Sequence, residues 1–234
     1  DRLKARGVKR IVAVPLFVHT RSEVLDQTRY ALGLRDNPSE VLRDALAARA
    51  HGHEGHAPGG HRHAFSTARV KLPLSLVMTP ALDADPLVAR ILLERAHALS
   101  SSPGREVVVL VAHGPVDDAA LPAWRSTLAV LAAKVRAGGG FKGAVYGVLR
   151  DDAAAPVRAA AVLDLRAKVA AASKGGRALV VPVLIARGGI EKKITQDLAG
   201  LDYAWDAKTL MPHEGFAAWV LARAAAARET ISGR

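Results

Sequence analysis

The chain has 234 residues, half of them apolar and about a quarter charged, which is enough to build the core of one or two domains and excludes a wholly disordered or fibrous chain. Lys and Arg outnumber Asp and Glu by 33 to 22, and this basic balance makes a polyanion the first partner to consider. The absence of cysteine excludes disulfides, thiolate metal sites and a cysteine nucleophile.

Short runs rich in Val, Ile and Leu alternate along the chain with longer stretches rich in Ala. The runs predict strands buried on both faces, at Ile11–Val14, Val107–Val111, Ala144–Leu149 and Ala178–Ile185. Asp1–Gly7 is typical of a helix end, and the Ala-rich stretches predict helices at Pro86–Leu99, Asp117–Ala137, Pro156–Ser173 and Gly215–Arg228, with another opening near Ile190. Asp85 fits an N-cap before Pro86, and Gly138 fits a helix stop. The alternation predicts an α/β fold with mainly parallel sheets flanked by helices.

The sequence also contains an internal repeat. Val14–Val18 (VPLFV) and Val181–Ile185 (VPVLI) are each followed by a Gly-Leu pair, nineteen residues after the first Val. Two related halves, 1–103 and 104–234, are the simplest explanation. About 75 residues separate Val107 from Pro182, but only 14 precede Pro15, so we expect the first half to lack its opening strand and helix.

A histidine-rich segment interrupts this pattern. His51, His53, His56, His61 and His63 place five of the nine histidines within thirteen residues, among Gly and Pro residues that disfavour helix and strand. Neutral imidazoles on such a loop suit Co²⁺, Ni²⁺, Cu²⁺ or Zn²⁺. We consider both an auxiliary metal-capture loop and a solvated insertion with incidental metal affinity.

Several classes of partner are not supported. Only ten residues are aromatic, the basic residues are scattered, and no helix-turn-helix, RNP or zinc-finger pattern occurs, so we expect no nucleic-acid partner. Gly138–Gly143 fits G-x-G-x-x-G, but it follows a predicted helix and precedes a predicted strand, the reverse of the dinucleotide-binding context. No apolar run approaches the roughly 18 residues of a membrane span, and Asp1–Arg10 does not resemble a signal peptide. We therefore expect no membrane partner and a cytoplasmic location, and a homo-oligomer remains open.

Two segments carry side chains suited to chemistry. His113 follows the strand Val107–Val111 directly and precedes Gly114, which places it at the carboxyl end of a strand, where open α/β folds bind ligands. Glu191 falls in the first turn of the helix predicted near Ile190, where the helix dipole favours a carboxylate. A structural role is an alternative for each residue. Facing one cleft, an imidazole and a carboxylate could bind a divalent cation and move protons.

These segments resemble motifs of the class II tetrapyrrole chelatases, the group of ferrochelatase and the CbiX-type sirohydrochlorin chelatases. Val109–Pro115 (VLVAHGP) is similar to the family's strand-His-Gly signature, and both VPLF-like segments look like its second characteristic strand. Gly189–Glu191 is similar to the His-Ile-Glu segment of ferrochelatases, and Asp83–Leu87 and Met211–Glu214 resemble the start of a characteristic helix. The similarity covers nearly the whole chain apart from the histidine-rich segment.

The resemblance implies an enzyme that inserts a divalent cation, Co²⁺ first with Ni²⁺ or Fe²⁺ as alternatives, into sirohydrochlorin or a related tetrapyrrole in cobalamin or cofactor biosynthesis, with no organic cofactor. His113 and Glu191 fall on the family's metal-site residues, and His19 lies near the turn where short chelatases carry a further histidine. Arg187, Lys192 and Arg150 are the predicted ligands of substrate carboxylates. Gly188–Gly189 stands where a second histidine is expected, so a metal or tetrapyrrole carrier that kept the fold without catalysis is the alternative.

Overall fold

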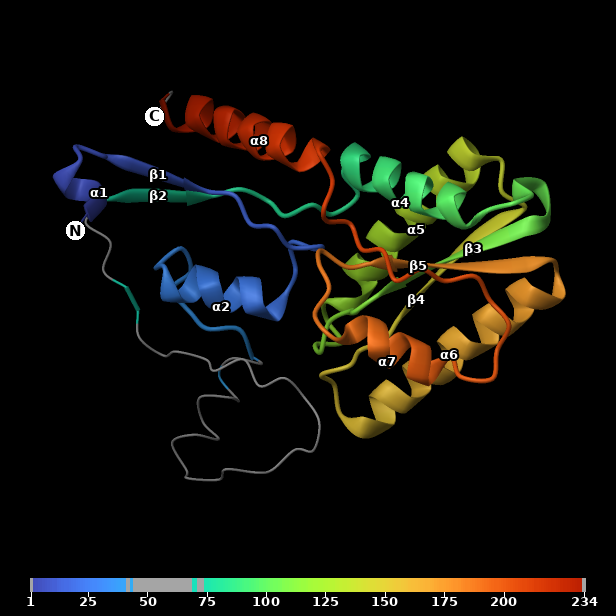
Figure 1. Cartoon of the computed structure of the whole chain (residues 1–234). Coiled ribbons are helices and arrows are strands. Elements are labelled where there is room, and N and C mark those ends of the chain that lie inside the picture. Colours follow the sequence, from blue (N-terminus) through green and yellow to red (C-terminus); the bar gives the residue numbers. More distant parts are fainter. Residues whose placement is uncertain (1, 41–42, 44–68, 71–73, 233–234) are drawn as a thin grey trace. The chain divides into compact units, whose positions relative to one another are not determined.

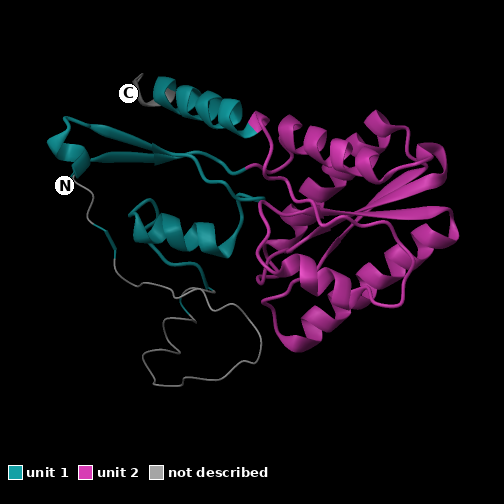
Figure 2. Cartoon of the chain, viewed as in Figure 1, with its two compact units in different colours: residues 1–81, 216–234 teal, residues 82–215 magenta. Residues whose placement is uncertain are grey.

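The computed structural model describes residues 2–40, 43, 69–70 and 74–232. The chain divides into two compact units, one of residues 1–81 with 216–234 and the other of residues 82–215 (Figures 1 and 2). The predicted halves 1–103 and 104–234 follow the internal repeat and stay a prediction, and their boundary differs from that of the compact units. The difference has a physical cause, because the helix Pro86–Leu99 packs on elements of the second unit and the last helix belongs to the first.

The first unit contains a two-stranded parallel sheet. Its elements are α1 (Arg2–Ala5), β1 (Arg10–Ala13), α2 (Glu23–Ala31), β2 (Ser75–Met78) and nearly all of α8 (Gly215–Ser232). β1 pairs with β2 in parallel, and Ile11 lies opposite Leu76. The first VPLF-like segment therefore follows β1, whereas the second begins inside a strand of the other unit. α1 confirms the helix predicted before the first strand, and α2 and β2 were not predicted.

The second unit has a three-stranded parallel sheet in the order β4-β3-β5. The strands are β3 (Glu106–Ala112), β4 (Gly143–Val148) and β5 (Arg177–Val183). Val109 of the central strand lies opposite Val145 on one side and Val180 on the other. Residues 108–112 are all fully buried, which is why this strand has an unbroken apolar sequence. The predicted α/β class with parallel sheets flanked by helices is confirmed.

Helices cover both faces of this sheet (Figure 1). α4 (Pro86–Leu99) and α5 (Leu121–Gly139) pack together on one face, and α6 (Ala155–Lys174) and α7 (Ile190–Asp197) lie on the other; a short 3₁₀ turn, η1, spans Pro103–Arg105. Val109 and Val111 share one face of β3 and form a buried cluster with Leu165 of α6 and Ile194 of α7.

The helix ends follow their local sequences. Asp85 caps α4 as predicted, because its side chain accepts a hydrogen bond from the amide of Leu87. The stop predicted at Gly138 is two residues too early: the left-handed residue is Gly140, at φ +64°. The ring of Phe141 fills the space beside Gly139 that a Cβ would need. Among the described helices, none combines the length and apolar character needed to cross a bilayer.

Candidate metal site

His113 is held at the carboxyl end of β3 by a tight turn. Its carbonyl accepts a 2.7 Å hydrogen bond from the amide of Arg150, which follows the neighbouring strand β4. Gly114 has φ +78°, and a Cβ added there would lie 2.9 Å from Cβ of Val148. Glycine is therefore required for the chain to turn this close to β4. The turn leaves the His113 side chain 30% exposed at the edge of the sheet.

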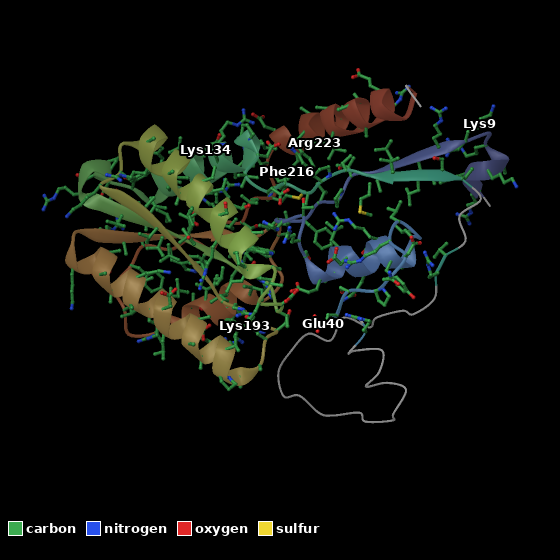
Figure 3. All side chains as sticks on the ribbon, turned by 180° about the vertical axis from the view of Figure 1, so that it is seen from behind. Lys9, Glu40, Lys134, Lys193, Phe216 and Arg223 are labelled. Carbon is green, nitrogen blue, oxygen red and sulfur yellow. The ribbon has the colours of Figure 1, made fainter. Side chains whose placement is uncertain are left out.

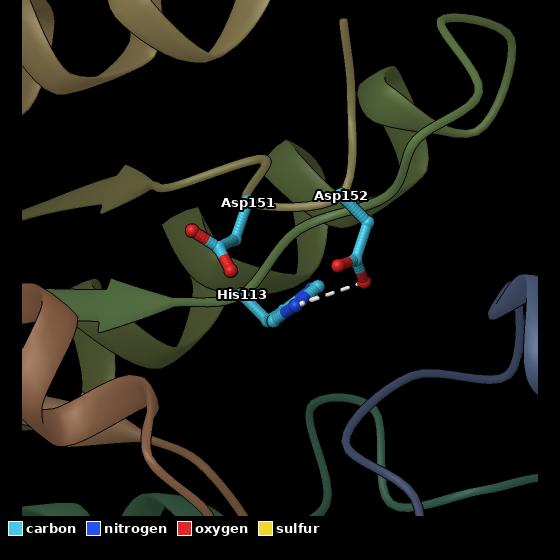
Figure 4. Close-up of side chains that lie close together, drawn as sticks. All are labelled: His113, Asp151 and Asp152. Atoms are coloured by element: carbon cyan, nitrogen blue, oxygen red, sulfur yellow. Dashed lines mark ion pairs between the residues drawn. The ribbon is translucent and has the colours of Figure 1, made fainter. Parts of the chain in front are cut away.

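Two aspartates after β4 complete a cluster with His113 (Figure 4). Each of His113, Asp151 and Asp152 offers a metal-ligating atom, and these atoms all lie within 4.8 Å of one another. Nε2 of His113 is 3.3 Å from Oδ2 of Asp152, and Nδ1 is 3.0 Å from the carbonyl oxygen of Gly114. The residues meet because β3 and β4 are neighbouring parallel strands, whose carboxyl ends share one edge of the sheet.

The imidazole of His113 is electrostatically biased towards its charged form. Burial lowers the pKa of this group, but the hydrogen bond and negative charge of Asp152, together with the Gly114 carbonyl, outweigh burial and raise the pKa above its ordinary value. The negative charge of Asp152 that favours a proton on the His113 imidazole would also favour a metal ion bound to it.

Asp151 is an internal carboxylate whose two oxygens are already engaged. Oδ1 accepts a 2.9 Å hydrogen bond from Nε of Arg158, and Oδ2 is paired with Nζ of Lys193. Lys193 lies on α7 and is labelled in Figure 3. Arg158 also reaches Asp197 at 3.0 Å. Burial raises the pKa of Asp151, but the hydrogen bonds from Lys193 and Arg158 outweigh it and hold the pKa below its usual range. Asp152, which pairs with His113, is the more exposed of the two carboxylates, with 34% of its side chain accessible against 2% for Asp151.

Glu191 is buried at the amino end of α7 and is only 8% exposed. Its Oε2 accepts hydrogen bonds from the amides of Gly188, at 3.3 Å, and Gly189, at 3.0 Å. Its Oε1 is buried and has no hydrogen-bond partner among the described residues. Glu191 follows β5, the other neighbour of β3, but it is not a member of the His113 cluster. The predicted joint metal site of His113 and Glu191 stays a prediction.

The predicted substrate-binding residues differ in placement. Arg187 and Lys192 are exposed around the amino end of α7. Arg150 is 7% exposed, and its guanidinium is turned inwards onto the carbonyls of Pro115 and Val116 and the carboxylate of Asp118. In this conformation the guanidinium of Arg150 is engaged within the protein. The predicted roles of the three residues as substrate ligands stay predictions.

The remaining predicted histidines lie elsewhere in the chain. His19 is buried in the first unit, and its Nδ1 accepts a 2.9 Å hydrogen bond from the amide of Arg21. His51, His53, His56, His61 and His63 lie outside the described residues. Their predicted metal roles stay predictions.

Sequence reasoning did not identify Asp151 and Asp152 as partners of His113. A signal was present, because the two aspartates follow the predicted strand Ala144–Leu149 as closely as His113 follows its own strand. Consecutive strands of a parallel sheet are often neighbours, and applying this rule to these two strand ends would have found the cluster.

No protein-family model and no curated protein matches the chain. Among solved structures, SirB from Bacillus subtilis with Fe³⁺ is similar, with a TM-score of 0.61 and 13% identity over 99% of this chain and 77% of that one. DR2241 from Deinococcus radiodurans, a multi-domain protein with structural similarity to chelatases and two additional novel domains, gives a TM-score of 0.51 and 21% identity. That match covers 93% of this chain and 41% of DR2241. The chain therefore has a chelatase-like fold, as its sequence motifs predicted.

Proposed function

We propose that this protein is a metal chelatase that inserts a divalent cation into a tetrapyrrole and receives the cation at His113 and Asp152. One observation carries the proposal. Nδ1 of His113 faces the carbonyl of Gly114, while Nε2 faces the carboxylate of Asp152. A carbonyl only accepts hydrogen bonds, so Nδ1 carries the proton in neutral His113. Nε2 then directs its lone pair at the carboxylate of Asp152. Both groups are acceptors and repel each other, so this arrangement becomes favourable when a cation lies between them.

That cation can be a proton or a metal ion. The imidazole lone pair and the carboxylate oxygen are both ligands that divalent cations accept, and a metal-binding histidine commonly donates its other ring N–H to a carbonyl. The chelatase-like fold shared with SirB, whose structure was solved with Fe³⁺, favours the metal. Co²⁺ is the proposed ion, with Ni²⁺ and Fe²⁺ as alternatives, because the ligand set does not separate them.

Metal insertion also requires the loss of two protons from the ring. The cation replaces two pyrrole N–H protons, so one M²⁺ enters and two H⁺ leave, with no change of oxidation state. Glu191 is suited to receive such a proton, because its Oε1 is buried without a hydrogen-bond partner among the described residues. Arg187 and Lys192 are exposed beside α7, where they would bind substrate carboxylates. A polycarboxylate such as sirohydrochlorin is the proposed ring, and the cytoplasm is the proposed location.

An absorbance assay tests this function directly. Purified protein is mixed with sirohydrochlorin and Co²⁺, and the spectral change on metal insertion is followed against the reaction without protein. We expect turnover that His113→Ala abolishes and Asp152→Asn strongly reduces. His97→Ala is the matched control, because His97 is an exposed histidine of the same unit whose ring lies tilted against that of Phe141, with ring centroids 5.1 Å apart. Wild-type protein without turnover, or equal losses in all three variants, would refute the proposal.

The alternative is a non-catalytic carrier of metal or tetrapyrrole with the same fold. It is favoured by the position of Glu191 outside the His113 cluster and by Gly188–Gly189 at the turn where short chelatases carry a second histidine. A carrier binds Co²⁺ through His113 and binds the tetrapyrrole but produces no metallated ring. Titration calorimetry with each ligand alone, beside the absorbance assay, separates the two functions.

A further inference from the structure

Arg150 combines an unusual backbone with an unusual set of side-chain contacts. It follows β4 and has φ +52°, a left-handed conformation that few residues other than glycine adopt. Such a conformation costs on the order of 1 kcal/mol and persists only where the surrounding structure holds it. Here it occurs directly before Asp151 and Asp152, two of the three members of the metal cluster.

The side chain of Arg150 holds the loop that follows His113. Nε donates to the carbonyl of Pro115 at 3.0 Å, Nη2 donates to the carbonyl of Val116 at 2.5 Å, and Nη1 pairs with Asp118 at 2.6 Å. The backbone of the same residue donates to the carbonyl of His113. Four contacts from one residue thus tie the segment His113–Asp118 to the end of β4.

We propose that Arg150 is the positioning residue of this site, which sets the imidazole of His113 against the carboxylate of Asp152 at the spacing a divalent cation requires. The inference rests on the proposed function for the identity of the ligand. Both sides of the cluster depend on Arg150, because its backbone turns the chain into Asp151–Asp152 and its guanidinium fixes the loop after His113. Only a planar fork of donors reaches two carbonyls and a carboxylate together, so lysine does not replace arginine here.

Four substitutions, three of them at Arg150, separate positioning from folding. Arg150→Met removes the guanidinium and keeps the unfavourable left-handed backbone, whereas Arg150→Gly removes the guanidinium and relieves the backbone strain. Arg150→Gly should therefore recover stability that Arg150→Met loses. The matched control is Arg166→Met, because Nη1 of Arg166 donates to the carbonyls of Asp197 and Ala199, and neither residue is a member of the metal cluster.

The first measurement is the affinity for Co²⁺ itself, followed by its visible absorption and by calorimetry. All variants are made in full-length protein in which the five histidines of 51–63 are changed to Gln, so that these side chains do not compete for the ion. We expect Arg150→Met and Arg150→Gly to bind Co²⁺ at least tenfold more weakly than the parent, the loss typical of residues that orient metal ligands. Arg150→Lys should not restore the affinity, and Arg166→Met should retain it.

The second measurement is amide hydrogen exchange, which needs no metal. Arg150→Gly should speed exchange in residues 113–118, and Arg166→Met should speed it only around residues 197–201. Unchanged Co²⁺ affinity or unchanged exchange in Arg150→Gly overturns the proposal. A raised KM for the tetrapyrrole at unchanged Co²⁺ affinity also overturns it, because Arg150 is then a substrate ligand. If the parent binds no Co²⁺ through His113, the proposed function fails, and exchange still decides whether Arg150 positions the loop.

Discussion

The turn between His113 and β4 makes Gly114→Ala the most informative single substitution. Gly114 has φ +78°, and a left-handed backbone costs alanine about 1–2 kcal/mol. The new Cβ would also lie 2.9 Å from Cβ of Val148, which is only 6% exposed and cannot move into solvent. Overpacking of this kind adds about 1–3 kcal/mol. The reduced entropy of the unfolded chain offsets about 0.4–1 kcal/mol.

The sum is a loss of about 3 kcal/mol in the free energy of unfolding, within a range of about 1–5 kcal/mol, measured by urea denaturation. Gly200→Ala is the first control: Gly200 has φ +80° with nothing within 4 Å of the added Cβ, so only the backbone cost, about 1 kcal/mol, should appear. Gly104→Ala has open space and no positive φ and should be close to neutral. The reasoning is refuted if Gly114→Ala costs no more than Gly200→Ala, because β4 then does not approach the turn as closely as described.

Three further changes test the site and the core. Asp152→Asn should lower the pKa of His113, because it removes the carboxylate that raises it; an NMR titration of the His113 ring measures this, and an unchanged pKa contradicts the pairing. The pKa of Asp151 is held below its ordinary value, so its contribution to stability is complete above that ordinary value and is lost as the pH falls through the lower folded value. Asp151→Asn should therefore flatten the acid side of the stability curve, and an equally steep curve argues against the ion pairs. Leu165→Ala, at a fully buried position, should cost about 2–5 kcal/mol in urea unfolding, and a loss below 1 kcal/mol is inconsistent with the cluster around it.

The helices and strands that could be predicted are those whose burial leaves an apolar pattern in the sequence. The strands near Val107–Val111 and Ala178–Ile185 are buried on both faces, and such burial leaves uninterrupted apolar runs. The cap at Asp85 and proline at Pro86 marked the start of α4. In contrast, β2 has only four residues, and α2 buries the single side chain of Leu25. Neither leaves a periodic apolar signal that sequence reasoning can detect.

The candidate site was predicted where a single strand end carries its residues and was missed where two strand ends meet. His113 and Gly114 were found because a histidine and a glycine directly follow a buried strand. Asp152 was not found, because its contact with His113 depends on which strands are neighbours, and that is a property of the sheet order. Arg150 was predicted to bind substrate carboxylates because a charged residue at a strand end is usually exposed. Its inward conformation depends on backbone carbonyl groups of the 115–118 loop. Every residue has a backbone carbonyl, so the sequence gives no sign of these contacts.

The division of the chain into units also has a consequence for the order of folding. The second unit is one continuous stretch, residues 82–215, whereas the first combines residues before 82 with residues after 215. During synthesis the three-stranded sheet and its helices leave the ribosome before α8 does, so the second unit can close its core on contacts within its own continuous stretch of chain. The first unit must wait for residues 216–234 and close over a separation of more than 130 residues. The half of the protein that carries the His113 cluster is therefore the half that can mature first.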